Sequence, residues 1–383
     1  MRILFYAPDA YSVFFQETKF GFGGVETEIE ITAHAMAEMF NDEVVVVTRD
    51  HGEKKSISGK VKVIQMTVLK GEGYWQKKRN PVAKLAGVLT AKKERGIAEI
   101  IEDVKPDIVY MQGLHKMCYE LQEHCKAKNI PFVFKGAHDM DFGGEENDRV
   151  AFEKWTGRST EKMNEFYKTI GLFLVQTPFQ QKVVRERYGK EAVLILNPLV
   201  IGEKNVAHNK KYDVMWVGKT NNFKRPELLL AIAREMPELK FCMVCNKFDE
   251  EAWIKLKAEL PSNVEFFDFV AAGQMKTLYE RSRLFVSTSV HEGFANTFLQ
   301  AASCGVPVIS MCADPNNMIS GGAGILTGDS VKEVVRSIRQ LLSDNGSLAK
   351  ASDTAFLYAK QHHDSAMIIG KVRALITEHF GLK

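Results

Sequence analysis

The chain alternates short apolar, β-rich runs with segments of helical periodicity, and this alternation restricts the fold more than any other feature. Residues 44–47 are four consecutive valines, as expected for a strand buried on both faces. The other apolar runs of the first half are 2–7, 62–66, 107–113, 131–137, 171–177 and 192–197, and helical patterns lie at 24–40, 85–104, 115–128, 159–169 and 178–188. The pattern predicts a parallel sheet with helices on both faces.

A second series of the same kind follows a polar stretch, 198–211, that is typical of a linker. Its strands are expected near 213–218, 240–246, 264–270, 284–289, 307–311 and 324–326, and its helices near 225–235, 250–259, 274–281, 296–304 and 330–342. The length of 383 residues fits two domains. We therefore predict two Rossmann-like, doubly wound domains, 1–197 and 212–363, facing a cleft lined by the carboxyl ends of their strands.

Composition and charge exclude several classes of protein. Hydrophobic residues make up 45% and charged residues 26%, as in ordinary globular chains. No apolar run reaches the roughly 18 residues of a membrane span. The first residues suit a buried strand better than a signal peptide. The net charge of +3 is too small to indicate a nucleic-acid partner. We expect a cytoplasmic protein, either free or peripheral at the inner face of the membrane.

Two of the six cysteines, Cys242 and Cys245, form a C-x-x-C pair inside the strand-like run 240–246. Residues three apart on a strand point to opposite faces of the sheet, so the two thiols cannot easily share a metal ion. Core packing is the favoured interpretation, and it agrees with a reducing compartment.

Glycines and a histidine follow predicted strands of the first domain. Gly23 and Gly24 come after the first strand and open a helix, where free backbone N–H groups can meet an anion; a simple turn explains them equally well. His138 follows the fifth strand, where it can hydrogen-bond a sugar, assist proton transfer or act as a structural cap. Asp139 and Asp141 spell D-x-D, but turn chemistry accounts for them without a metal.

Two lysines flank the first strand–helix junction of the second domain. Lys219 follows Gly218, Lys224 lies five residues further on, and Pro226 marks a helix start. Cations near a helix N-terminus oppose the helix dipole, and an anion bound between them would resolve that conflict. The alternative is a solvated charged loop.

The segment 290–310 is the most informative in the chain. A strand ends at Glu292, a short helix follows, and Gly305 precedes a Val-Pro-Val that starts the next strand. Gln300 lies eight residues after Glu292, slightly more than two helical turns, so both side chains are expected on one side.

This strand, Glu-Gly-Phe, helix, Gly-Val-Pro-Val arrangement resembles the signature of retaining glycosyltransferases of family four, which have the GT-B fold. The resemblance extends over nearly the whole chain. Gly23 and Gly24 are similar to the family's N-terminal glycine loop, His138 to its active-site histidine, and Asn197 with the following proline to its domain-joining pair. The family usually has Glu at the position of Gln300 and often Arg at that of Lys219.

The resemblance implies a role for each matching residue. Lys219 and Lys224 would hold the donor diphosphate in place of a metal ion. Glu292 would bind donor-sugar hydroxyls, His138 would contact the donor sugar near the reacting carbon, and Gln300 would bind the ribose. The remaining donor-binding positions are Gly23, Gly24, Gly218, Phe294, Ala295, Asn296 and Thr297. No metal or other cofactor is implied.

The GT-B fold also implies that the last segment, 364–383, crosses back to the N-terminal, acceptor-side domain. Residues from Met367 to Ile376 repeat apolar side chains at helical spacing and need a surface to bury, which predicts a helix over 364–380.

The implied activity is transfer of a sugar from a nucleoside-diphosphate sugar to a hydroxyl of a sugar, lipid-linked, polysaccharide-precursor or protein acceptor, with retention of configuration. The basic segment 77–95, preceded by Tyr74 and Trp75, is either a solvated helix face or a site for an anionic membrane surface. Two other functions stay open: a nucleotide-sugar epimerase or hydrolase of the same fold, and a non-catalytic nucleotide-sugar sensor suggested by Gln300.

Overall fold

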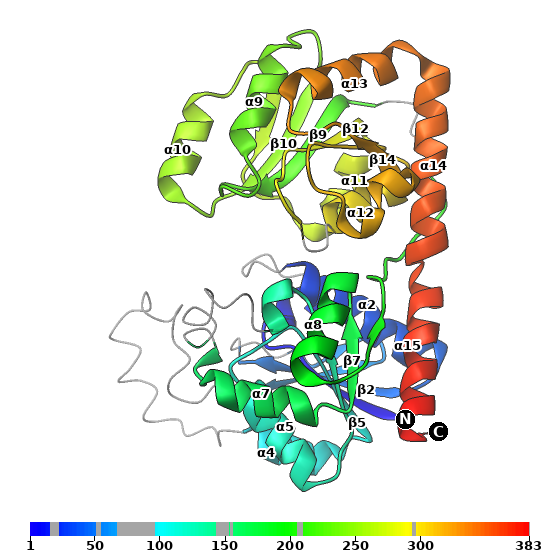
Figure 1. Ribbon diagram of the computed structural model, residues 1–383. Coiled ribbons are helices and arrows are strands. Elements are labelled where there is room, and N and C mark those ends of the chain that lie inside the picture. Colours follow the sequence, from blue (N-terminus) through cyan, green and yellow to red (C-terminus); the bar gives the residue numbers. More distant parts are fainter. Residues whose placement is uncertain are drawn as a thin grey trace. The chain divides into compact units, whose positions relative to one another are not determined.

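The structure is a computed structural model that describes residues 1–15, 23–50, 55–66, 96–142, 153, 156–204, 210–292 and 296–382. The chain divides into two compact units (Figure 1). Unit 1 contains Met1–Pro198 and Ala366–Lys383, and unit 2 contains Leu199–Ser365. The basic segment 77–95, for which the sequence left a solvated helix face and a membrane surface open, lies outside the described residues.

Unit 1 is built on an eight-stranded sheet in the order β3-β4-β2-β1-β5-β6-β7-β8. Its pairs are parallel except for β3 with β4. The strands are β1 (Arg2–Tyr6), β2 (Glu43–Arg49), β3 (Ile57–Ser58), β4 (Val61–Met66), β5 (Ile108–Gln112), β6 (Phe132–Lys135), β7 (Leu172–Val175) and β8 (Ala192–Leu194). The helices are α1 (Tyr11–Phe15), α2 (Gly24–Met39), α4 (Ile97–Val104), α5 (Cys118–Ala127), the 3-10 helix η2 (Asp139–Phe142), α7 (Thr160–Thr169), α8 (Pro178–Tyr188) and α15 (Ser365–Phe380).

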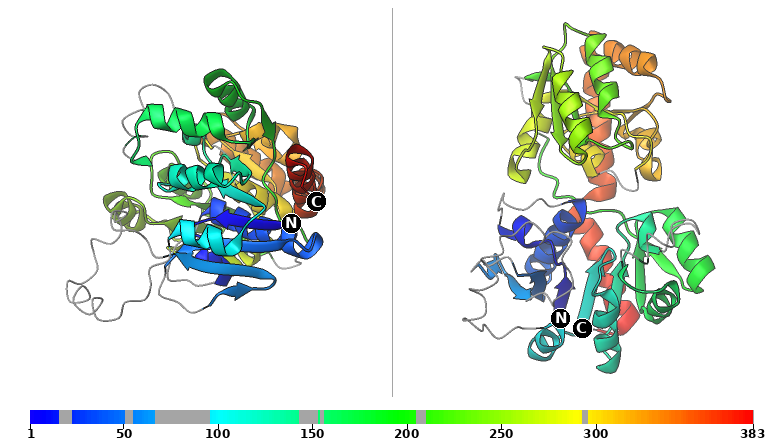
Figure 2. Two further views of the ribbon diagram at one scale, coloured as in Figure 1. Left: turned by 90° about the horizontal axis from the view of Figure 1, so that it is seen from below. Right: turned by 90° about the vertical axis from the view of Figure 1, so that its left-hand side faces the viewer.

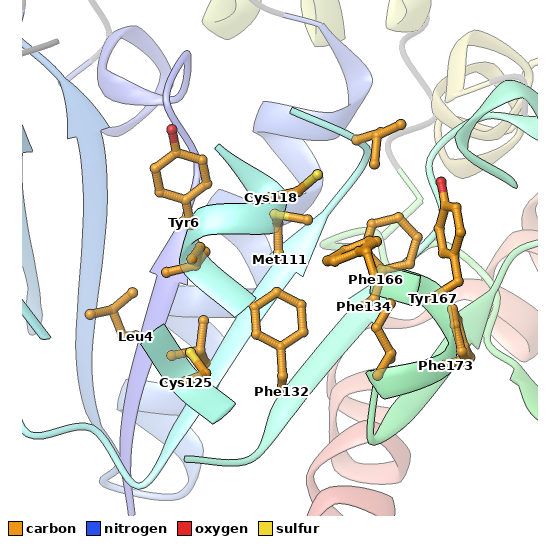
Figure 3. Packing of buried hydrophobic residues seen from close by; sticks show 14 of the residues in the cluster. Leu4, Tyr6, Met111, Cys118, Cys125, Phe132, Phe134, Phe166, Tyr167 and Phe173 are labelled. Atoms are coloured by element: carbon orange, nitrogen blue, oxygen red, sulfur yellow. The ribbon is translucent and has the colours of Figure 1, made fainter. Parts of the chain in front are cut away.

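The sheet of unit 1 separates two apolar cores, because alternate residues of a strand point to opposite faces. On β1, Leu4 and Tyr6 belong to the core under α4, α5, α7 and α8, whereas Ile3 and Phe5 belong to the core under α1, α2 and α15. Aromatic rings around Phe134 fill much of the first core (Figure 3).

The C-terminal helix α15 completes the second core. Ile368, Ile369, Val372 and Ile376 are buried among residues of β1, β2 and α2. Arg373 of α15 also donates to Asp42, with Nε 2.8 Å from one carboxylate oxygen. The same carboxylate lies 3.1 Å from the amino group of Met1. The first and last segments of the chain therefore share one hydrophobic core and one charge cluster.

Unit 2 has a parallel six-stranded sheet in the order β11-β10-β9-β12-β13-β14. The strands are β9 (Tyr212–Lys219), β10 (Phe241–Asn246), β11 (Val264–Phe267), β12 (Ser282–Ser287), β13 (Val308–Ser310) and β14 (Gly324–Leu326). The helices are α9 (Pro226–Arg234), α10 (Glu250–Ala258), α11 (Ala272–Glu280), α12 (Asn296–Ser303), η4 (Pro315–Asn317), η5 (Ile319–Ala323), α13 (Val331–Ser343) and α14 (Asn345–His363). Helices lie on both sides of each sheet (Figure 2).

The two cysteines of the C-x-x-C pair confirm the predicted packing. Cys242 and Cys245 are buried in the two cores on opposite faces of the unit 2 sheet, and both are free thiols. Burial raises the pKa of each thiol to about 12, so both stay protonated and unreactive.

Each sheet has one place where the direction of winding reverses. In unit 1 it lies between β1 and β5, and in unit 2 between β9 and β12. Loops that leave two neighbouring strands at such a point run to opposite faces, so the carboxyl ends of these strands stay open to a ligand.

Within the described ranges, no helix has the length and apolar character needed to span a membrane.

Removing a buried side chain of α15 should destabilise unit 1. Ile376 is 0% exposed, so Ile376→Ala is expected to lower the free energy of unfolding by about 2–5 kcal/mol. Met367, which is 48% exposed on the same helix, provides the matched control, and Met367→Ala should change little. Urea unfolding followed by circular dichroism measures both. A chain truncated after His363 that keeps full stability would contradict a role for α15 in this core.

Candidate functional site

The loops after β9 and β12 are joined by backbone and side-chain hydrogen bonds at the reversal point of unit 2. The Val290 N–H donates to the Phe223 carbonyl over 2.9 Å. The Thr288 hydroxyl donates to the Lys224 carbonyl over 2.5 Å, and Arg225 Nε donates to the Thr288 carbonyl over 2.7 Å. The two loops thus form one hydrogen-bonded unit at the carboxyl edge of the sheet.

This junction brings together two of the residues that the sequence singled out. Lys224 Nζ forms an ion pair with Glu292 Oε1, and their side chains are only 22% and 12% exposed. The pair is partly shielded from water, so its attraction exceeds that of a surface pair. The arrangement presents one cation and one carboxylate at the same point of the edge.

Gly218 and Lys219 are the last two residues of strand β9. The Lys219 side chain is exposed. Gly218 has a packing reason for lacking a side chain, because an added Cβ would lie 2.5 Å from the ring of Trp216. That ring is buried, and its Nε1–H donates to the Thr288 hydroxyl over 3.0 Å. Gly218 therefore supports the junction through Trp216 and Thr288.

Glu292 and Gln300 do not lie on one helix, so the helical spacing does not determine whether their side chains lie on the same side. Helix α12 begins only at Asn296, after Glu292. Asn296 and Thr297 form its first turn, whereas Phe294 and Ala295 lie outside the described residues. Gln300 Oε1 accepts a hydrogen bond of 3.2 Å from the hydroxyl of Tyr279, which is buried on α11.

Gln300 also lines a cavity of about 160 Å³ in unit 2. The cavity lies against the segment that begins unit 2 and against helices α11 and α12, with Leu199, Met275, Tyr279 and Cys304 among its walls. Glu280 and Lys276 add charge to it. The Gln300 side chain is therefore hydrogen-bonded to a buried tyrosine hydroxyl and also lines the cavity.

In unit 1, Gly23 and Gly24 stand at the start of α2, as predicted. Gly23 is the N-cap residue, and its backbone N–H donates to Glu26 Oε2 over 2.7 Å. A carboxylate thus already accepts from the first free N–H group of this helix. An anionic ligand at Gly23 would have to displace Glu26.

His138 is exposed immediately before η2, and its ring nitrogens have distinct roles. Nδ1 accepts a hydrogen bond of 3.1 Å from the Met140 backbone N–H. In a neutral ring the proton must then be on Nε2, which can donate to a ligand oxygen. This geometry favours a hydrogen-bond donor over a general base.

The two aspartates of D-x-D hold the same loop. Asp141 Oδ2 accepts from the backbone N–H groups of Ala137 and His138 over 2.6 and 2.8 Å. Asp139 Oδ1 accepts from Gln180 over 3.0 Å. Burial raises the pKa of Asp141, although these hydrogen bonds act in the opposite direction. Across the part of the chain that the structure describes, no group of three or more His, Cys, Asp or Glu residues is placed to hold a metal ion.

A buried ion pair that the sequence analysis missed lies at the carboxyl edge of the unit 1 sheet. Lys135, the last residue of β6, pairs with Glu28 of α2, and their side chains are 2% and 3% exposed. Gln112 and Gln176, at the ends of β5 and β7, donate to Glu28 over 2.6 and 3.4 Å. The sequence feature that could have indicated this pair is Lys135 at the end of an apolar strand, but no sequence pattern identifies Glu28 as its partner.

Similarity to known proteins is found both in the sequence of unit 2 and in the fold of the chain. Residues 211–344 match the family model described as Glycosyl transferases group 1. The matched region lies within unit 2. Solved structures that cover the whole chain show that its fold is GT-B.

Among those structures is a sucrose-phosphate synthase from Thermosynechococcus elongatus, with a TM-score of 0.71 and 13% identity over 100% of both chains. Anabaena HepE, solved with UDP and glucose, has a TM-score of 0.69 and 18% identity over 99% of this chain and 100% of its own. A point mutant of S. aureus TarM, solved with fondaparinux, α-GlcNAc-glycerol and UDP, has a TM-score of 0.71 and 11% identity over 98% and 99%.

A relative by sequence is the O-antigen chain mannosyltransferase B of Escherichia coli. It is 31% identical over 101 residues, which is 26% of this chain and 26% of the relative. The matched region thus spans about a quarter of that protein.

The buried pair of Glu28 and Lys135 makes a stability prediction. Lys135→Met should lower the free energy of unfolding by about 3–5 kcal/mol, because it leaves the Glu28 carboxylate buried without its cation. Glu28→Gln combined with Lys135→Met should recover much of that loss, since no charge then stays buried. Chemical unfolding of both variants provides the measurement. A double variant as unstable as Lys135→Met alone would mean that lost packing, not charge, causes the effect.

Proposed function

We propose that this protein is a metal-independent, retaining glycosyltransferase that moves a sugar from a nucleoside-diphosphate sugar to a hydroxyl acceptor. The observation that carries the proposal is the pair of Lys224 and Glu292 at the reversal point of a glycosyl transferases group 1 domain. Ligands of doubly wound sheets bind at this point. A cation and a carboxylate there suit the two ends of the scissile bond, a diphosphate and a sugar.

In the proposed reaction the bond between the anomeric carbon and the diphosphate oxygen breaks, and the acceptor hydroxyl oxygen bonds to that carbon. The electron pair leaves with the diphosphate, and the hydroxyl proton passes to water. Lys224 and Lys219 stabilise the charge that develops on the leaving diphosphate, as preorganised cations do. Retention requires the acceptor to join the face that the diphosphate leaves.

Donor binding would exchange the partners of Lys224. A diphosphate carries more negative charge than one carboxylate, so it competes with Glu292 for the ammonium group. Glu292, once released, can accept hydrogen bonds from donor-sugar hydroxyls. His138 would donate its Nε2–H to an oxygen of the donor sugar. Gln300 would bind the ribose, with its Oε1 already held by Tyr279.

The relatives support the substrate classes of this proposal. HepE and TarM were solved with UDP together with a sugar or glycosylated ligand, and the bacterial relative is named a mannosyltransferase of an O-antigen chain. We infer a nucleotide-sugar donor and a glycan or lipid-linked acceptor for this chain, with action in the cytoplasm. The alternative is a sensor that binds the donor without turnover. It is suggested by Gln300, which stands where the family usually has Glu.

Lys224→Ala should weaken binding of a nucleoside diphosphate much more than binding of the nucleoside. Loss of a charge-assisted hydrogen bond of about 1.5–3 kcal/mol corresponds to about tenfold to a hundredfold in the dissociation constant. Calorimetry with UDP, GDP, uridine and guanosine provides the comparison. Glu292→Gln is the matched control: it removes the competing carboxylate, so diphosphate affinity should stay or rise. Equal losses for nucleoside and diphosphate in Lys224→Ala would refute the assignment.

Glu292→Ala should reduce acceptor-dependent turnover by about 10²-fold, the scale of losing a positioned polar group. Gln300→Glu should fold normally, because it keeps the oxygen that accepts from Tyr279, and its turnover should be unchanged or improved. Turnover of both variants is measured by product analysis, after a screen has identified a donor and an acceptor.

Wild-type turnover, measured in the same way, should survive a metal chelator. Abolition by chelator with rescue by manganese would disprove metal independence, and turnover only in Gln300→Glu would make the natural protein a sensor.

A further inference from the structure

Arg225, directly after Lys224, has a backbone conformation that arginine rarely adopts. It is the N-cap residue of α9, with φ 47° and ψ 56° in the left-handed region. The other non-glycine residues of unit 2 with positive φ, among those the structure describes, are two asparagines, Asn316 and Asn317. Asparagine tolerates this region, whereas an arginine persists there only when its surroundings hold it.

The Arg225 guanidinium is held by three different loops. Nε donates to the Thr288 carbonyl over 2.7 Å, in the loop after β12. One terminal nitrogen donates to Asp329 over 2.7 Å, before α13, and the other lies 3.4 Å from the Cys312 sulfur, after β13. The side chain is 16% exposed. Each guanidinium nitrogen thus has one partner, and the three partners hold the side chain between three loops.

The main chain of Lys224 is held by hydrogen bonds to Thr288 and Asn221. Its carbonyl accepts from the Thr288 hydroxyl, which in turn accepts from Trp216 over 3.0 Å. Its backbone N–H donates to Asn221 Oδ1 over 2.9 Å. Thr288 therefore bonds both to the main chain of Lys224 and to the side chain of its neighbour.

We propose that Arg225 is a positioning residue that sets the location of Lys224, and through it the affinity of unit 2 for a diphosphate. The inference rests on the proposed function, in which Lys224 binds the diphosphate. Arg225 itself contacts neither donor nor acceptor. Its loss should therefore weaken recognition of the diphosphate and leave recognition of the nucleoside unchanged.

Arg225→Gly separates positioning from folding. Glycine adopts the observed φ without strain. The variant therefore removes the guanidinium contacts and at the same time relieves the strain of the left-handed backbone conformation. Its thermal midpoint should stay near that of the wild type. Arg225→Asn, which also tolerates the left-handed region, is a second variant. Asn129→Gly is the matched control, because Asn129 has φ 54° and lies in unit 1 after α5.

The first measurement needs no ligand. Amide hydrogen exchange of Val290 reports the junction, because this N–H donates to the Phe223 carbonyl. Arg225→Gly and Arg225→Asn should raise its exchange rate about tenfold or more, the effect of losing a hydrogen bond from a charged group. Asn129→Gly should not. Unchanged exchange in both Arg225 variants would overturn the proposal.

The second measurement is calorimetry with UDP, GDP, uridine and guanosine. Both Arg225 variants should lose about tenfold in affinity for the diphosphate that the wild type binds, with nucleoside affinity unchanged. Equal losses for diphosphate and nucleoside, or no loss, would overturn the positioning role. A wild-type protein that binds no nucleoside diphosphate would refute the proposed function, whereas the exchange measurement would still decide whether Arg225 positions Lys224.

Discussion

The neighbouring position of β9 and β12 is the constraint on which the site depends. Their parallel pairing places Leu284 beside Val214 and Phe285 beside Met215, so both strands end at the same edge. The winding reverses between them, and hydrogen bonds join the loops that follow at this edge. The bonds from Thr288 and Val290 to the loop after β9 then bring Lys224 to Glu292, which lies 68 residues away in the sequence. Every role proposed for these side chains follows from this one junction.

Unit 1 is arranged on the same principle but is held differently at its carboxyl edge. A buried pair, Lys135 with Glu28, links the end of β6 to helix α2, and glutamines at the ends of β5 and β7 complete its hydrogen bonds. Such a pair contributes little net stability, but it is costly to break on one side. It fixes α2, which begins at Gly24, relative to the strand that leads to His138. The core that α2 covers also contains buried residues of α15, so this helix is part of unit 1.

The sequence predicts most of the strands because they are apolar throughout, as the valines of β2 show. It also predicts α8 at Pro178–Tyr188 and the helix now seen as α15. Helix α14 was not predicted, because two of its four buried residues, Ala355 and Ala359, are small and give a weak apolar pattern beside Phe356 and His363. Long-range partners could not be predicted either. Glu28 and Lys135 are 107 residues apart, and no local pattern pairs them. The helix α12 starts at Asn296, where the sequence predicts it, but Glu292 lies before that start, so a helical spacing cannot relate Glu292 to Gln300.

Determining the structure of the protein with a bound nucleoside diphosphate, UDP or GDP, tests the central claim most directly. The account predicts that the diphosphate lies at the carboxyl ends of β9 and β12, within hydrogen-bond distance of Lys224 Nζ. Glu292 should then be separated from Lys224 and free to meet a sugar. A nucleotide bound elsewhere, or at this edge with the pair of Lys224 and Glu292 intact, would contradict the account.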